Sequence, residues 1–220
     1  MGRTFIASLG FDQSTIVRLI GERGLSDGDS LWIITSSTPH PRAESALQSI
    51  REFVSKINPK VKVEVLRLDE KNLIENVAAL ARLIEESENP IVDASGGPRI
   101  IALSLFLAAC FSGVTVVYMT TETTGERIEI PVPVIPRRAL SSRQAEVLAL
   151  LPARVSELAR ELKLSKPTVS RILRSLVSKG LARRRPDRVF EPTLTGAILK
   201  RLHTIRAGSS PGPGTRTGGP

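Results

Sequence analysis

The chain has 220 residues, a formal net charge of +9 and 41% hydrophobic residues, which is typical of a folded protein with room for one large or two modest domains. Its one cysteine, Cys110, lies in an apolar run, so disulfides and a cysteine-based zinc site are excluded and a reducing cytoplasm is expected. The longest apolar run, 100–111, is too short to span a membrane and the first residues lack a signal-peptide pattern, so we expect a cytoplasmic protein without membrane or metal binding.

The first 136 residues alternate strand-like runs with helical patterns. Strands are expected at 4–9, 31–35, 61–68, 90–93 and 114–120, and helices at 14–21, 41–57, 72–86 and 99–111. The strands are continuous apolar runs, as in parallel strands that are covered on both faces. The pattern therefore predicts a Rossmann-like α/β fold, with a doubly wound, mainly parallel sheet.

Segment 127–136 marks the end of this domain. It alternates apolar residues and then meets prolines at 131, 133 and 136. Proline is disfavoured in central strands, so we expect an edge strand or an extended connector. We predict a sensor domain over 1–136, a second domain over 137–206, and a disordered tail over 207–220, which is rich in glycine, serine, proline and threonine.

The second domain is predicted to be an α+β winged helix-turn-helix. Helices are expected from Ser141 to Pro152, at 155–162, and from Ser165 to Gly180, with both serines as N-caps and Gly180 as the C-terminal stop. An arginine-rich hairpin and a closing helix follow. The third helix is expected to bury Val169, Ile172, Leu173, Leu176 and Val177, which recur at helical spacing.

Charge separates the two domains. Residues 1–136 carry 13 Lys+Arg and 17 Asp+Glu, a net charge of −4, whereas residues 137–220 carry 18 and 5, a net charge of +13. A basic module joined to an acidic domain indicates nucleic-acid binding, because phosphate neutralisation drives such binding. Between residues 163 and 188 the only acid is Asp187, whereas a merely solvated face usually mixes signs.

The outward face of the third helix and the hairpin at 181–190 form the predicted surface for duplex DNA. Hydroxyl groups can reach phosphates and base edges, and arginines can bind guanine or phosphate. Residues from about 140 to 202 resemble winged-helix transcription regulators of the MarR and ArsR type. The predicted DNA-binding residues are Lys166, Thr168, Ser170, Arg171, Arg174, Arg183, Arg184, Arg185 and Arg188.

Three polar loops, 9–14, 36–42 and 94–99, follow strands of the sensor domain. Ligands of doubly wound sheets bind at these carboxyl ends of strands. In the third loop, Gly96 and Gly97 would let the backbone approach an anion closely, and the proline and arginine that follow begin a helix at its positive end. These features predict a phosphate-bearing ligand. GxGxxG and P-loop motifs are absent, so NAD and nucleoside triphosphates are not expected in their usual modes.

The loops and the appended winged helix resemble the CARF–winged-helix transcription regulators of archaeal type I-A CRISPR systems over about residues 3–205. The motifs that carry the resemblance are Leu9-Gly10-Phe11-Asp12, Ser36-Ser37-Thr38 and Asp93-Ala94-Ser95-Gly96-Gly97-Pro98-Arg99. The resemblance implies control of CRISPR-associated genes in antiviral defence. It also implies a homodimer with a two-fold pocket for a cyclic oligoadenylate, in particular cyclic tetra-adenylate, and no other cofactor. The implied ligand contacts are Gly10, Phe11, Asp12, Ser36, Ser37, Thr38, Pro39, Arg42, Ser95, Gly96, Gly97, Pro98 and Arg99.

Two other functions stay open. Some CARF domains cleave the ring that they bind, and Ser36, Ser37, His40 and Arg99 could position a ribose 2′-hydroxyl for attack, although a lone loop histidine is more often incidental and no catalytic residue is assigned. Alternatively, the domain could sense another phosphorylated metabolite, because fold alone does not determine the ligand. Phe11, placed to stack on a base, favours a nucleotide.

Overall fold

The computed structural model describes residues 2–133, 135 and 140–207, and the chain divides into two units, Met1–Pro136 and Arg137–Pro220. Of the proline-containing end of segment 127–136, residues 134 and 136 lie outside the described residues. The two arginines that follow it, Arg137 and Arg138, also lie outside them. Ala207 is the last residue of the closing helix, and the rest of the predicted tail, 208–220, lies outside the described residues.

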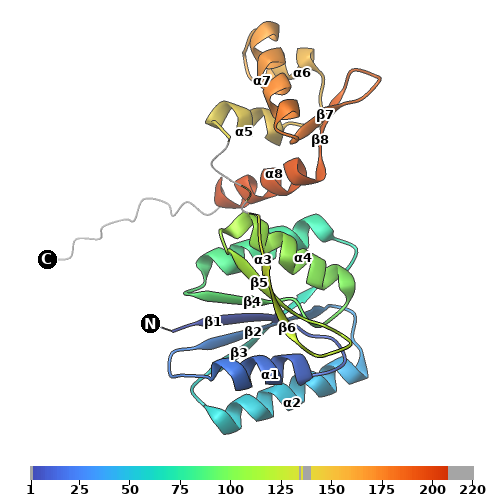
Figure 1. Cartoon of the computed structure of the whole chain (residues 1–220). Coiled ribbons are helices and arrows are strands. Elements are labelled where there is room, and N and C mark those ends of the chain that lie inside the picture. The colour runs from blue at the N-terminus through green and yellow to red at the C-terminus, as the bar shows by residue number, and fades with distance from the viewer. Residues whose placement is uncertain (1, 134, 136–139, 208–220) are drawn as a thin grey trace, which may run out of the picture. The chain divides into compact units, whose positions relative to one another are not determined.

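The first unit contains a six-stranded sheet with the order β3-β2-β1-β4-β5-β6 (Figure 1). The first five strands in this order are parallel, and β6 runs antiparallel to β5. This topology confirms the predicted doubly wound, mainly parallel sheet. The strand order reverses between β1 and β4, where such sheets leave a crevice at their carboxyl edge. The strands are β1 Thr4–Ser8, β2 Ser30–Ser36, β3 Lys62–Leu68, β4 Pro90–Asp93, β5 Val116–Thr120 and β6 Arg127–Pro131.

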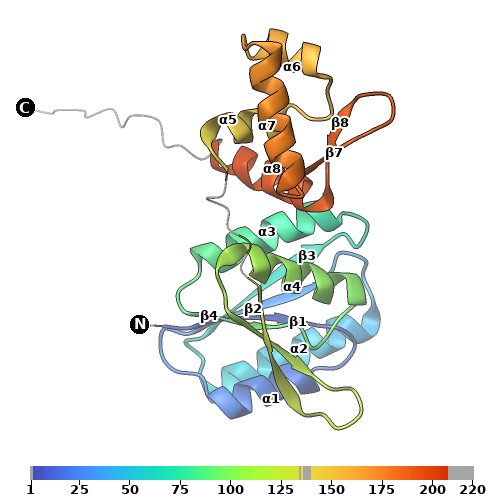
Figure 2. The ribbon, with the colours of Figure 1, turned by 45° about the horizontal axis from the view of Figure 1, so that its top comes forward.

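Two helices cover each face of this sheet (Figures 1 and 2). The central strand β1 is buried on both sides, so Phe5, Ile6 and Ala7 are all inaccessible to solvent, which explains the continuous apolar run. One face carries α1 (Ser14–Arg23) and α2 (Pro41–Ile57), and the other carries α3 (Leu73–Glu86) and α4 (Arg99–Ser112).

The segment at 127–136, for which two structures were open, begins as an edge strand. Residues Arg127–Pro131 form β6, which pairs with β5 through the register Val116↔Pro131 to Thr120↔Arg127. Its proline lies at the strand end and at the sheet edge, where a missing N–H costs little.

The second unit is a winged helix. Both predicted N-caps are confirmed: Ser141 forms a capping box with Gln144, and Ser165 accepts a hydrogen bond from the backbone N–H of Thr168. The stop at Gly180 is also confirmed, since this residue has φ +69° after the helix end. The elements are α5 Ser142–Ala149, α6 Val155–Glu161, α7 Lys166–Ser178, β7 Ala182–Arg184, β8 Phe190–Pro192 and α8 Leu194–Ala207.

The core of α7 is narrower than predicted. Val169, Leu173 and Leu176 are buried as expected, and Ile172 is half-buried. The prediction that Val177 is buried is wrong, because its side chain is 41% exposed. At 100° per residue, Val177 lies roughly 70° from the centre of the buried face, so in the last turn of the helix it points past the core.

Candidate functional site

The β1–α1 and β4–α4 loops pack backbone to backbone at the carboxyl edge of the sheet. A Cβ atom on Gly10 would lie 2.9 Å from the amide nitrogen of Gly97, and one on Gly96 would lie 2.6 Å from the carbonyl oxygen of Ser8. Gly97 also has φ +88°, which favours glycine. In the structure these glycines are therefore required for contact between the two loops, whereas the sequence had suggested close approach of the backbone to an anion.

Ser95 ties the ends of two strands together. Its N–H donates to Asp93 Oδ1 at 2.9 Å, and its hydroxyl accepts from the N–H of Thr120, also at 2.9 Å. Asp93 is buried, with Arg127 Nε 3.3 Å from Oδ2. Burial raises the pKa of Asp93, and the hydrogen bonds of Ser95 and the charge of Arg127 offset this only in part.

An exposed aromatic cluster joins the β1–α1 loop to the start of α2. The Phe11 ring is 52% exposed, the His40 ring centroid lies 4.2 Å from its centroid, and the Arg42 guanidinium lies 5.3 Å from it. His40 Nδ1 accepts from the backbone N–H of Arg42 at 3.2 Å and caps α2. The structure thus brings together Phe11 and Arg42, which were predicted separately.

Asp12 lies just before α1 and binds the first residue of that helix. Its carboxylate accepts from the N–H of Ser14 at 2.9 Å and from the Ser14 hydroxyl at 2.7 Å. These hydrogen bonds, with the charge of Arg42, lower the pKa of Asp12 and keep it ionised.

The remaining predicted contacts hold the loops or lie at helix starts. The Ser36 hydroxyl donates to Glu70 at 2.7 Å and accepts from the Thr38 N–H at 3.1 Å. The Ser37 N–H donates to the carbonyl of Leu68. Pro39 directly precedes His40, the N-cap of α2. Pro98 is the N-cap of α4, and Arg99 is its exposed first residue.

A pocket of about 340 Å³ opens between α1 and the β5–β6 turn. We call it the hairpin pocket. Of the residues that line this pocket, the sequence predicted only Asp12 and Ser95 as ligand contacts. The β5–β6 turn, which closes the pocket, follows a strand that carries no recognisable ligand-binding motif. Its lining residues are Asp12, Ser14, Thr15, Arg18, Ser95, Thr120, Thr121, Glu122 and Gly125.

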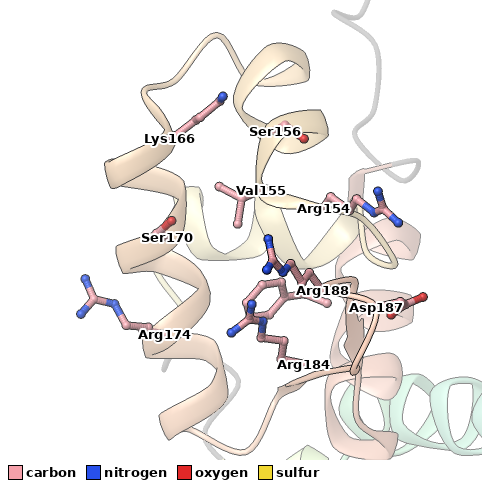
Figure 3. A pocket seen from close by; sticks show the side chains of 10 residues that line it. Arg154, Val155, Ser156, Lys166, Ser170, Arg174, Arg184, Asp187 and Arg188 are labelled. Carbon is pink, nitrogen blue, oxygen red and sulfur yellow. The ribbon is translucent and has the colours of Figure 1, made fainter.

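The winged helix holds a second and more basic site, a groove of about 550 Å³ between α6, α7 and the wing (Figure 3). Five basic side chains and one acidic side chain line it, so the groove is positively charged. Its lining residues are Arg154, Val155, Ser156, Lys166, Ser170, Arg174, Arg184, Asp187, Arg188 and Phe190.

The predicted residues of α7 do not all face this groove. Lys166, Ser170 and Arg174 recur every four residues and line it. The Thr168 hydroxyl is instead hydrogen-bonded to Ser165 at 2.8 Å, and Arg171 is exposed outside the lining.

The wing also divides its arginines between two faces. Arg184 and Arg188 point into the groove (Figure 3). Arg183 Nε instead lies 2.6 Å from Glu191, and Arg185 lies 3.3 Å from Asp187 and 3.8 Å from Glu191. Side chains alternate along a strand, which explains why neighbouring arginines have different partners.

Arg154 and Ser156 are groove residues that the sequence analysis missed. Arg154 is the N-cap of α6, and its backbone N–H donates to Glu157 at 2.7 Å. Arg154 lies just before α6, which packs against α7. Tertiary packing brings Arg154 to the groove, so local sequence could not predict it.

Among the described residues, no cluster of three or more His, Cys, Asp or Glu side chains could hold a metal, and no helix has the length and apolar character of a membrane span.

Two family models match the chain. Residues 3–131 match the model described as the Csa3 CRISPR-associated Rossmann-like domain, and residues 139–189 match the MarR family. No curated protein matches the chain.

Solved structures show more distant likenesses. The structure of Can2 from Sulfobacillus thermosulfidooxidans, in complex with cyclic tetra-adenylate, is 13% identical with a TM-score of 0.43, and the alignment covers 93% of this chain and 66% of Can2. The RuvB Holliday junction branch migration motor of Thermotoga maritima is 17% identical with a TM-score of 0.25, over 96% of this chain and 80% of RuvB. TM-scores this low support no functional argument.

Proposed function

The chain belongs to the family of the Csa3 CRISPR-associated Rossmann-like domain, and from this premise we propose that it is a homodimeric transcription regulator. It binds duplex DNA through the winged helix and a cyclic oligoadenylate, cyclic tetra-adenylate in particular, at the carboxyl edge of the sensor sheet. Ligand binding changes the affinity for DNA.

The observation that carries the proposal is the basic groove on the MarR-type unit. Lys166, Ser170 and Arg174 present a cationic helix face, while Arg184 and Arg188 approach from the wing. This arrangement suits a helix in the major groove with phosphates on either side. Arg171 lies outside the groove lining but is exposed on α7, and we propose that it also reaches DNA.

The proposed ligand site combines an aromatic surface with cations. Phe11 offers an exposed ring on which a base can stack, and Arg42 and Arg99 provide positive charge for phosphodiester groups at the beginnings of α2 and α4. The other residues predicted as contacts lie at the end of β2 or in the loops that follow β1, β2 and β4, at the same edge of the sheet.

An exposed apolar surface supports the homodimer. One turn after Arg99, α4 exposes Leu103 by 47%, and Phe106 and Leu107 are only half-buried. A dimer through this side of α4 covers apolar surface and places both Arg99 side chains near a common axis. Such an axis suits a cyclic tetranucleotide, which presents the same half to each protomer.

We propose no catalytic role for the edge. His40 is the histidine of the ring-cleavage alternative, but its Nδ1 already accepts a hydrogen bond and its ring packs on Phe11. These contacts of His40 suit a structural role at the side of the ligand site. Incubation of cyclic tetra-adenylate with the protein, followed by chromatography, should leave the ring intact.

The test is the linkage between the two ligands. The affinity for promoter DNA of the associated CRISPR genes is measured with and without cyclic tetra-adenylate, and the affinity for the ring with and without DNA. Linkage requires the same factor in both directions, which we expect to be at least about fivefold. One ring per two chains supports the shared pocket. No DNA binding, no ring binding, or a factor of one would overturn the regulator.

A further inference from the structure

Two threonines that line the hairpin pocket have side-chain hydroxyls without hydrogen-bond partners among the described residues. Thr15 Oγ1 and Thr120 Oγ1 are both buried, and neither has a hydrogen-bond partner among the described residues. Thr15 lies in the first turn of α1, and Thr120 ends β5. A buried hydroxyl without a partner is costly, so a ligand that supplies the missing partners is favoured.

Arginine contacts hold the two walls of the pocket together. Arg18 of α1 donates to the carbonyl of Gly125 in the β5–β6 turn. Arg127 of β6 donates to Glu22 and, at 3.2 Å, to the carbonyl of Thr15. The pocket is therefore held by contacts between α1 and the hairpin.

The charges of the side chains that line the hairpin pocket indicate which chemical group of a ligand it can bind. Asp12 and Glu122 are acceptors when ionised and repel phosphate, while Arg18 is already bonded to Gly125. The other polar side chains are hydroxyls, which both donate and accept. A base would need flat apolar walls, whereas hydroxyl and carboxylate groups match a sugar.

We infer that the hairpin pocket binds a ribose of the cyclic oligoadenylate, with the Thr15 and Thr120 hydroxyls hydrogen-bonded to its free 2′-hydroxyl. This inference rests on the proposed function and extends it. Asp12 and Ser95 belong both to the pocket and to the predicted ligand loops, so a ring at the edge can reach it. The volume of about 340 Å³ lies at the lower end of small-molecule sites, enough for one sugar unit.

The experiment measures calorimetric affinities of the full chain for cyclic tetra-adenylate and for its 2′-deoxy counterpart. Thr15→Val and Thr120→Val keep the side-chain shape and remove the hydroxyl. One ring meets two pockets in the dimer, so each variant removes two hydrogen bonds and should weaken binding of the ribose ring about 25-fold, at about fivefold per bond. The deoxy ring lacks the partner of both threonines and should bind wild type at least that weakly. The deoxy ring should bind variants and wild type alike, because the same interaction is missing in each case.

Thr115→Val is the matched control, since Thr115 lies just before β5, in a pocket at the opposite end of the strands. It should leave both affinities unchanged. The melting temperature of Thr15→Val and Thr120→Val should equal or exceed that of wild type, which separates lost contacts from misfolding. If the variants bind the ribose ring as tightly as wild type does, ribose binding in the hairpin pocket is wrong, while the proposed regulator function is unaffected. A wild type that binds neither ring would overturn both.

Discussion

Several arginines of the sensor unit form ion pairs within that unit, whereas the arginines that line the winged-helix groove are paired with no acid of the described residues. In the sensor unit Arg3 pairs with Asp29, Arg67 with Glu44, and Arg127 with Asp93 and Glu22. In the winged helix the groove arginines make no ion pair with a described residue, whereas those on the other face of the wing pair with Glu191 and Asp187. Paired and unpaired arginines are thus distinguished by their contacts and not by the net charge of the segment.

The largest expected effect concerns the groove. Substituting Arg154, Arg184 and Arg188 together by Gln should weaken duplex DNA binding roughly 10²- to 10³-fold at about 0.1 M salt, because each lost phosphate contact removes a counterion-release contribution. The slope of log affinity against log salt should become shallower by about 3. Fluorescence anisotropy over a salt series measures both quantities.

The matched control for the groove is the pair Arg183→Gln and Arg185→Gln. It removes two charges from the same hairpin, but from side chains paired with acids. We expect a loss of less than about tenfold. An equal loss per charge in the two sets would show that only total charge matters, and the division of the wing into two faces would be wrong.

Breaking a sensor ion pair should lower stability instead. Asp29 is buried and binds Arg3 at 2.6 Å. Asp29→Asn should lower the free energy of unfolding by about 2 kcal/mol, below the value for fully buried pairs because Arg3 is partly exposed. Urea unfolding followed by the fluorescence of Trp32, the only tryptophan, reports on the sensor unit. The groove variants should leave this curve unchanged.

This loss should depend on pH. Burial opposes ionisation of Asp29, but the hydrogen bonds from Arg3 and the Ser26 N–H outweigh it and lower the pKa. A lowered pKa in the folded state stabilises at neutral pH, and this stabilisation disappears as pH falls through that pKa. The difference between wild type and Asp29→Asn should therefore begin to shrink as pH falls below about 3.9, the pKa of an aspartate in the unfolded chain. A constant difference would mean that the carboxylate charge is not its source.

The loop contact can be tested by a pair of alanine substitutions. Gly97→Ala should cost about 2 kcal/mol, because its φ of +88° is strained and its Cβ would lie 3.1 Å from the carbonyl oxygen of Leu9. Gly113→Ala has a similar φ of +78° but no atom within 4 Å, so only strain, about 1 kcal/mol, is expected. Equal losses would show that the close packing of the two loops contributes nothing.

The smallest expected effect is on the ligand. Arg99→Ala should weaken cyclic tetra-adenylate binding about tenfold for each Arg99 that the ring contacts, or about 1.4 kcal/mol per lost charge-assisted hydrogen bond. Unlike Arg127, Arg99 is exposed, so the melting temperature should stay constant. Arg51→Ala, an exposed arginine of α2, is the control and should bind as wild type does. Unchanged affinity for Arg99→Ala would place the phosphates elsewhere.

Much of the fold could be read from local sequence. The continuous apolar runs of the parallel strands, the caps at Ser141 and Ser165, and the stop at Gly180 depend on near neighbours, so periodicity and residue type suffice to predict them. The three polar loops were placed correctly at one edge, because every parallel strand ends there.

Tertiary structure decided which of those residues meet. The pairing of Phe11 with His40 and Arg42, the packing of Gly10 on Gly97, and the hairpin pocket each join segments whose distance in space no local pattern encodes. In the wing, the sequence showed three consecutive arginines, and only the folded hairpin revealed that the middle one faces the groove while its neighbours reach acids. Residue type determines what a side chain can do, but its partners depend on long-range packing, which sets the burial and neighbours of each group.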